Sequence, residues 1–203
     1  MSVDKNKFTT INQPIQGDYR DRGSKFLAFA YPVASIEEIK KALENLKKEH
    51  PKATHHCYAY RLGTNGLIFR ANDDGEPAGS AGKPILNQLD SSGVTNILVV
   101  VVRYFGGTLL GVPGLINAYK AATFNALERA EKTEKWIEKR VNLEFEYSVM
   151  GEVLYLLKQS EATIYKQQLE LFCTIIAGIP CAKFLNVITK LTEVRGVKID
   201  TEI

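Results

Sequence analysis

The sequence predicts an α+β protein made of two α/β-sandwich domains, on three observations. Residues 97–102 form an apolar, β-branched run that we expect to be a buried central strand. A glycine-rich bend and a helix with apolar residues at helical spacing follow it. A charged segment, residues 128–140, then separates this first part from a second with the element order βαββαβ. We place the boundary between 133 and 136, which gives domains 1–134 and 135–203. The alternative for the charged segment is the solvated end of one long helix.

The first domain is predicted to alternate strands with helices. Ser35, followed three residues later by Glu38, is the expected N-cap of a helix that Pro51 ends. The Asn65-Gly66 pair predicts a hairpin. In chain order, we expect strands at 25–33, 55–62 and 67–70, a short helix at 84–89, the central strand, and a helix whose buried face includes 115, 118, 119, 122 and 126.

The second domain has its own pattern of alternation. Residues 141–147 alternate apolar and polar side chains, as a half-buried strand does. We expect a helix at 151–159, strands at 163–168 and 171–177, a helix around 184–191 and a last strand at 197–203. This order is the ferredoxin-like, split βαβ arrangement.

Composition limits the classes of function. The formal net charge of +3 and the pI near 8.6 are mildly basic, which permits nucleic-acid contact without indicating DNA specificity. Three cysteines without Cys-x-x-Cys spacing make a disulfide framework or a zinc site improbable. The first residues lack the apolar core of a signal peptide, and no apolar run approaches the ~20 residues of a membrane span. We therefore expect a cytoplasmic protein with no membrane partner.

The bend after the central strand is a candidate anion site. A strand, a glycine bend and a helix start bring free backbone N–H groups together, and Pro113 suits the first turn of a helix. The residues match neither a P-loop nor a G-x-G-x-x-G fingerprint. The candidate ligand- or anion-binding residues are His55, Lys83, Arg103, Gly106, Gly107, Gly111, Gly114 and Lys120.

A second candidate is the polar loop at 72–84. Its carboxylates Asp73, Asp74 and Glu76 fit a hard cation such as Mg²⁺, although the same residues also cap turns. Arg103 ends a buried strand and therefore needs a partner, either one of these acids or a bound phosphate. His55 begins a strand beside the loop and is as consistent with a structural role as with a functional one.

Four ordered motifs resemble the YigZ/IMPACT family, in particular its two-domain bacterial members of the YigZ type. The resemblance covers the whole first domain, and the second domain is similar to the smaller C-terminal domain of those members. The motifs are residues 23–28 (GSKFLA), 53–61 (ATHHCYAYR), 73–86 (DDGEPAGSAGKPIL) and 102–107 (VRYFGG) with Leu115 and Ala118-Tyr119.

This resemblance implies a first domain with the fold of ribosomal-protein domains and of elongation factor G domain IV, and a ferredoxin-like second domain. It also implies translational regulation through a bound partner for the eukaryotic members, RNA or ribosome association for the bacterial ones, and no established catalytic residue. The sequence departs from the family motif at three positions. Leu110 lies near the position usually held by lysine, Pro113 replaces a glycine and Asn117 replaces an arginine. Lys120 compensates in part for the two lost charges.

Our leading hypothesis is a non-enzymatic, translation-associated regulatory protein that binds RNA, the ribosome or a translation-factor partner. In the second domain, Tyr147, Tyr165 and Phe172 are either base-stacking residues on an open sheet or core residues. Regulation through a protein partner alone is a further possibility. The alternative is a Mg²⁺-dependent enzyme that acts on a phosphorylated small molecule, with a cleft formed by His55, Asp73, Asp74, Glu76 and Arg103.

Overall fold

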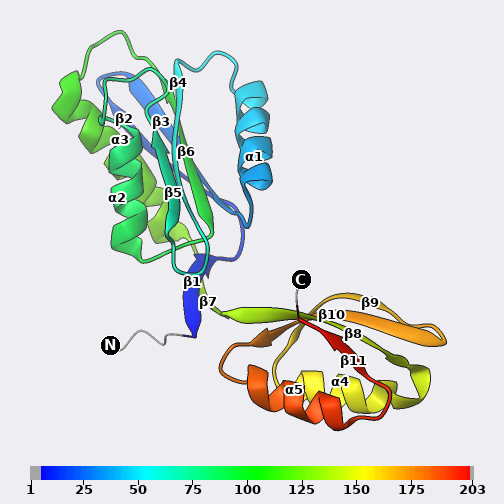
Figure 1. Ribbon diagram of the computed structural model, residues 1–203. Helices are drawn as coiled ribbons and strands as arrows, with labels where there is room; N and C mark the ends of the chain where they lie inside the picture. The colour runs from blue at the N-terminus through cyan, green and yellow to red at the C-terminus, as the bar shows by residue number, and fades with distance from the viewer. Residues whose placement is uncertain (1–5, 202–203) are drawn as a thin grey trace. The chain divides into compact units, whose positions relative to one another are not determined.

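The computed structural model describes residues 6–201, which divide into two compact units (Figure 1). The N-terminal unit is Phe8–Lys135. Among the described residues, the C-terminal unit contains residues 136–201 together with Asn6 and Lys7. The division falls inside the segment where the sequence predicts a boundary.

The N-terminal unit is built on a five-stranded antiparallel sheet with the order β2-β3-β6-β4-β5. Its strands are β2 (Ile15–Asp21), β3 (Ser24–Pro32), β4 (His55–Leu62), β5 (Ile68–Asn72) and β6 (Ile97–Tyr104). Helices α2 (Gly82–Ser92) and α3 (Gly111–Arg129) cover one face of the sheet, and α1 (Ile36–Glu49) covers the other (Figure 1). The two faces of the sheet therefore belong to two separate hydrophobic cores.

The predicted central strand is confirmed as β6. Its residues 97–102 are fully buried, because α2 and α3 pack on one side and α1 on the other. The predicted cap of α1 is also confirmed. Ser35 Oγ accepts a hydrogen bond from the Glu38 N–H at 3.2 Å, and a Glu38 carboxylate oxygen accepts one from the Ala34 N–H at 2.7 Å.

The sequence patterns missed β1 (Lys7–Ile11), β2 and β7 (Lys132–Trp136). β1 and β7 pair with each other in a two-stranded sheet. The reading of residues 128–140 as a helix end and connection was therefore wrong in part, since α3 ends at Arg129 and a strand begins three residues later. The partner of β7 lies more than 120 residues away in the chain, so no local periodicity indicates the pairing. β2 is an edge strand with mostly polar residues and lacks an apolar alternation.

In the C-terminal unit the predicted βαββαβ order is confirmed. The strands are β8 (Glu138–Glu146), β9 (Thr163–Gln168), β10 (Phe172–Pro180) and β11 (Lys198–Asp200), in the antiparallel order β11-β8-β10-β9. Helices α4 (Met150–Gln159) and α5 (Phe184–Glu193) pack against one face of this sheet, and a short 3₁₀ helix, η1 (Tyr147–Val149), precedes α4 (Figure 1). The last predicted strand is shorter than expected, and residues 202–203 lie outside the described part of the chain. Among residues 6–201, no helix combines the length and the apolar character needed to span a bilayer.

Candidate functional site

The loop between β5 and α2 is organised by one carboxylate. Asp73 accepts hydrogen bonds from the N–H groups of Gly79, Ala81 and Gly82 at 2.8–3.0 Å. Burial raises the pKa of Asp73, but the three N–H donors outweigh this effect and leave the pKa below its usual value. Asp73 thus fixes the loop against the start of α2.

Asp74 ties the same loop to the beginning of β4. Its side chain accepts a hydrogen bond from the backbone N–H of His56 at 2.6 Å. In return, Nδ1 of His55 donates to the carbonyl oxygen of Asp74 at 2.7 Å. Asp74 has a φ of 43°, in the left-handed region, so the loop turns sharply where these two bonds form.

Glu76 is the centre of a buried polar cluster. The Arg103 guanidinium donates to Glu76 Oε1 at 2.7 Å, and the Tyr119 hydroxyl donates to the same oxygen at 2.7 Å. The side chains of Glu76 and Arg103 are only 3% and 6% exposed. Nε2 of His55 lies 3.9 Å from Glu76 Oε1. We call the residues His55, Cys57, Glu76, Arg103 and Tyr119 the Glu76 cluster.

Cys57 completes this cluster on its buried side. Its Sγ lies 3.2 Å from the Tyr119 hydroxyl and 3.0 Å from the carbonyl oxygen of Asp73. Burial raises the pKa of the Cys57 thiol and that of the Tyr119 phenol, so both stay protonated at neutral pH. The cluster therefore holds no thiolate nucleophile, and it joins β4, β6, α3 and the β5–α2 loop.

The three carboxylates predicted to bind Mg²⁺ do not converge. Asp73 is directed at backbone N–H groups, Asp74 at the β4 backbone and Glu76 at Arg103 and Tyr119. No group of three or more potential ligand side chains that could hold a metal ion occurs among residues 6–201. A cation would have to displace the protein's own donors, so the geometry does not support the Mg²⁺ hypothesis.

The glycine bend has structural reasons for at least three of its glycines. A Cβ on Gly106 would overlap the backbone of Gly23 and Ser24, and the Gly106 N–H donates to Ser24 Oγ at 3.1 Å. Gly107 and Gly111 have φ values of 86° and 69°, which favour glycine. Arg103 is held by Glu76. The anion-binding role of the bend stays a prediction.

The surroundings of the bend and the remaining candidates are solvent-exposed. Lys83, at the start of α2, and Lys120, on α3, are both exposed, and Gly114 lies in the first turn of α3. Large apolar side chains are also exposed here, in place of the positive charges expected at an anion site. They are Phe105 (47%), Leu109 (81%), Val112 (46%) and Ile116 (39%).

Tyr119 is the member of the cluster that sequence reasoning missed as a site residue. The sequence places it only on the buried face of a helix. The available signal is chemical: a fully buried phenol requires a hydrogen-bond partner for its hydroxyl. That partner is Glu76, which lies 43 residues earlier in the chain.

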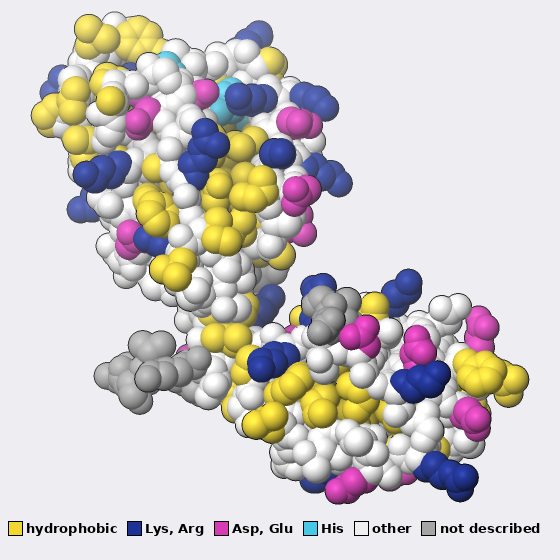
Figure 2. Space-filling model, viewed as in Figure 1, with side chains coloured by type: hydrophobic (Ala, Val, Ile, Leu, Met, Phe, Trp, Pro, Cys, Tyr) yellow, Lys and Arg dark blue, Asp and Glu magenta, His cyan; other side chains and the backbone are white. Residues whose placement is uncertain are grey.

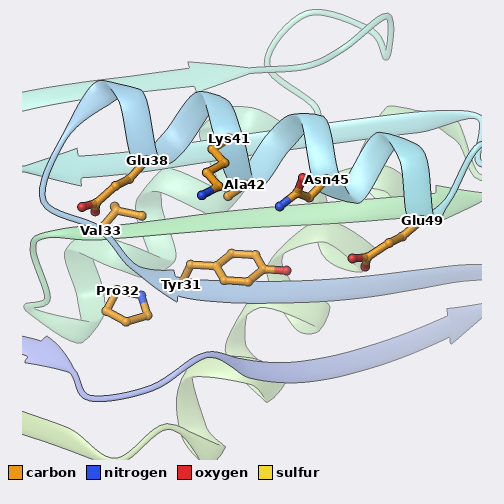
Figure 3. A pocket seen from close by; sticks show the side chains of 8 residues that line it. All are labelled: Tyr31, Pro32, Val33, Glu38, Lys41, Ala42, Asn45 and Glu49. Atoms are coloured by element: carbon orange, nitrogen blue, oxygen red, sulfur yellow. The ribbon is translucent and has the colours of Figure 1, made fainter.

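A groove of about 330 Å³ runs between α1 and β3, on the opposite face of the sheet (Figure 3). Figure 3 shows Tyr31 on its floor, with Glu38, Lys41 and Glu49 along its helical wall. Burial, together with the charge of Glu49, raises the pKa of Tyr31. With two carboxylates and one lysine in its lining, this groove does not have the charge of an anion site.

The open face of the C-terminal sheet differs from a nucleic-acid platform. Phe172 and Tyr147 are 71% and 56% exposed, so neither is a core residue. The hydroxyl of Tyr165 donates to Glu138 at 2.6 Å, and burial and this carboxylate raise its pKa to about 12. Strand alternation places four acidic and three basic residues on this face, so the face is of mixed charge. They are Glu138, Glu144, Glu146, Asp200, Arg140, Lys166 and Lys198.

His56 gives a pH-dependent prediction for the stability of the N-terminal unit. It is buried, Nε2 has no hydrogen-bond partner among the described residues, and burial lowers its pKa below 6.5. The unfolded chain therefore binds more protons as the pH falls below 6.5, and stability decreases with it. We expect the thermal midpoint to fall between pH 7.5 and 5.5 and the fall to be smaller in His56→Gln, as measured by calorimetry. Equal falls in both proteins would contradict this assignment. The window lies above the range in which Asp73 titrates, because its pKa is held below its usual value.

The fold and the site together define a class of protein. It is a two-unit α+β protein in which an acidic loop of the N-terminal unit is bonded to the end of the central strand through Glu76 and Arg103. Residues 22–127 match the family model described as the Impact N-terminal domain. The chain belongs to the IMPACT family.

Individual relatives agree with this assignment over most of the chain. The Escherichia coli IMPACT family member YigZ is 36% identical over 84% of both chains, and Bacillus subtilis YvyE is 33% identical over 84% of this chain and 80% of its own. A crystal structure of a hypothetical protein matches with 33% identity and a TM-score of 0.74 over 96% of both chains. The rat Protein IMPACT is 41% identical over a shorter stretch, 45% of this chain and 30% of that protein.

Proposed function

We propose that this chain is a non-enzymatic, translation-associated regulatory protein that binds a protein component of the translation machinery. The translational context follows from the family resemblance described above. The observation that carries the binding mode is the exposure of large apolar side chains on the N-terminal unit, at the start of α3 and around β5. Groups of exposed apolar side chains are typical of protein-binding surfaces. The C-terminal unit also exposes large apolar side chains, among them Leu171, Phe172 and Leu185.

The Glu76 cluster supports a binding protein over an enzyme. Its carboxylate already accepts two hydrogen bonds, and its thiol and phenol are protonated at neutral pH. A general base or nucleophile needs a free, poised group within reach of a substrate. The cluster offers rigidity instead, since its contacts join β4, β6, α3 and the β5–α2 loop.

Two features favour a protein partner over RNA. The open face of the C-terminal sheet carries four carboxylates together with Arg140, Lys166 and Lys198, so it has no net positive charge to attract a phosphate backbone. The glycine bend is bordered by the exposed apolar residues Phe105, Leu109 and Val112. A partner surface with apolar side chains therefore fits this unit better than a phosphate backbone.

Co-sedimentation with purified ribosomes across a salt series tests this proposal. We expect the wild-type protein to sediment with ribosomes and to lose less than about threefold in affinity between 50 and 200 mM salt. A protein that makes 6–10 phosphate contacts would lose roughly 10³–10⁵. A steep loss would assign the binding to RNA, and the absence of sedimentation at low salt would overturn the proposal.

A further inference from the structure

Among the edge strands of the two larger sheets in residues 6–201, β5 has the least protected outer edge. β5 is the last strand of the five-stranded sheet, so one side of its backbone has no neighbouring strand (Figure 1). Leu67, Ile68 and Phe69 are exposed by 72%, 57% and 56%, and they are consecutive in the chain. Proteins usually protect such edges with charges, prolines, bulges or very short strands.

The other edges of the two larger sheets carry such protection. β2 has Asp18, Arg20 and Asp21. The pairing of β9 with β10 is interrupted by a register shift, and β11 has only three residues. The pairing of β5 with β4, by contrast, runs without interruption, and the only charged residue of β5 is Arg70.

β5 is also held in a fixed position. Arg61, on the neighbouring strand, pairs with Asp90 of α2 and donates to the carbonyl oxygen of Gly66 at 2.5 Å. The same guanidinium lies 5.0 Å from the centre of the Phe69 ring. Phe69 is thus oriented by its neighbours and remains more than half exposed.

The charge beside this edge is positive and uncompensated. Arg70 is exposed and makes no ion pair with another described residue, whereas Arg61 is neutralised by Asp90. On the side of the N-terminal unit where β5 lies, Figure 2 shows hydrophobic side chains with Lys and Arg side chains among them. An apolar segment that carries a carboxylate complements this surface.

We propose that β5 is a strand-addition site for an extended segment of a partner protein, with apolar side chains and a carboxylate opposite Arg70. This inference rests on the proposed function and names its contact. The partner strand satisfies the unpaired N–H and C=O groups of β5, and its alternate side chains cover Ile68 and Phe69. A second copy of this chain fits less well. Antiparallel pairing of two β5 strands about their central residue would place two Arg70 side chains opposite each other, which is destabilising.

The test compares charge substitutions in ribosome co-sedimentation of the full chain. We expect Ile68→Lys and Phe69→Lys each to weaken binding at least tenfold, because lysines on an edge oppose strand addition. The matched control is Leu185→Lys on α5, which is 81% exposed and adds the same charge. This control is expected to bind as the wild type does. Leu109→Lys, in the bend before α3, separately tests the other apolar group of the proposed binding surface.

Hydrogen exchange gives a second, independent readout. The outward-facing amides of β5 are expected to gain protection in the ribosome-bound protein, while the amides of α5 are unchanged. Unchanged β5 exchange, or β5 variants that bind as the wild type does, would overturn the strand-addition site and leave the proposed function intact. Loss of binding in Leu109→Lys alone would move the contact to α3. A dimer in analytical ultracentrifugation that Phe69→Lys abolishes would assign the edge to a second copy. No sedimentation of the wild type would overturn both proposals.

Discussion

Replacing Arg103 by methionine is expected to destabilise the N-terminal unit by about 3–5 kcal/mol. Glu76 is buried, with 8% of the whole residue exposed. When the guanidinium is removed, its carboxylate loses the cation that compensates its charge. The hydrogen bond from the Tyr119 hydroxyl remains, but a neutral donor does not balance a buried charge. The free energy of unfolding in urea measures this loss.

The control is the double variant Arg103→Met with Glu76→Gln. It removes the buried charge together with its partner, and we expect it to recover a large part of the stability that the single variant loses. A loss below about 1 kcal/mol in Arg103→Met would contradict a buried, mutually dependent pair. It would leave Arg103 available for a bound ligand.

Alanine at Gly106 is expected to cost about 3 kcal/mol or more, or to prevent folding of the N-terminal unit. A Cβ at this position would overlap the backbone of Gly23 and Ser24, and neither backbone can move without disturbing β3. The neighbouring glycine is a sharp control. A Cβ on Gly107 meets nothing within 4 Å, and only its φ of 86° opposes alanine, for about 1–2 kcal/mol.

Thermal and urea unfolding of the two alanine variants distinguish the structural role of the bend from a ligand-binding one. If Gly106→Ala is as stable as Gly107→Ala, the close approach of the two backbones is not required, and the glycine at 106 needs another explanation. If it is much less stable, the glycine serves the fold. An anion site at the bend is then no longer needed to explain it.

Local sequence patterns predicted the helices and strands in which buried residues recur at regular spacing or in which a cap is present. The β-branched run became β6, the strand at 55–62 became β4 with those same bounds, and Ser35 caps α1 as expected. Each of these signals lies within a few residues of sequence. β1 and β7 were missed because they pair with each other across more than 120 residues, and β2 was missed because most of its residues are polar.

The candidate site could be predicted in part. The sequence indicates that Arg103 needs an acidic partner and that the loop at 72–84 supplies three candidates. Only the fold selects Glu76, because Asp73 and Asp74 are already used to shape the loop. Tyr119 contributes to the Glu76 cluster from α3, which packs against the sheet after the glycine bend. The spacing of residues in the sequence does not predict this contact.

By itself, the sequence determined the family, the α+β class and the order of the elements in the C-terminal unit, because these depend on periodicity and on short motifs that each segment carries alone. The tertiary structure decided which carboxylate balances Arg103, that no cation-binding cluster forms among the described residues, and that β5 is an open edge. Those properties depend on which donors and strands the folded chain brings together, and such contacts join residues that lie tens of positions apart.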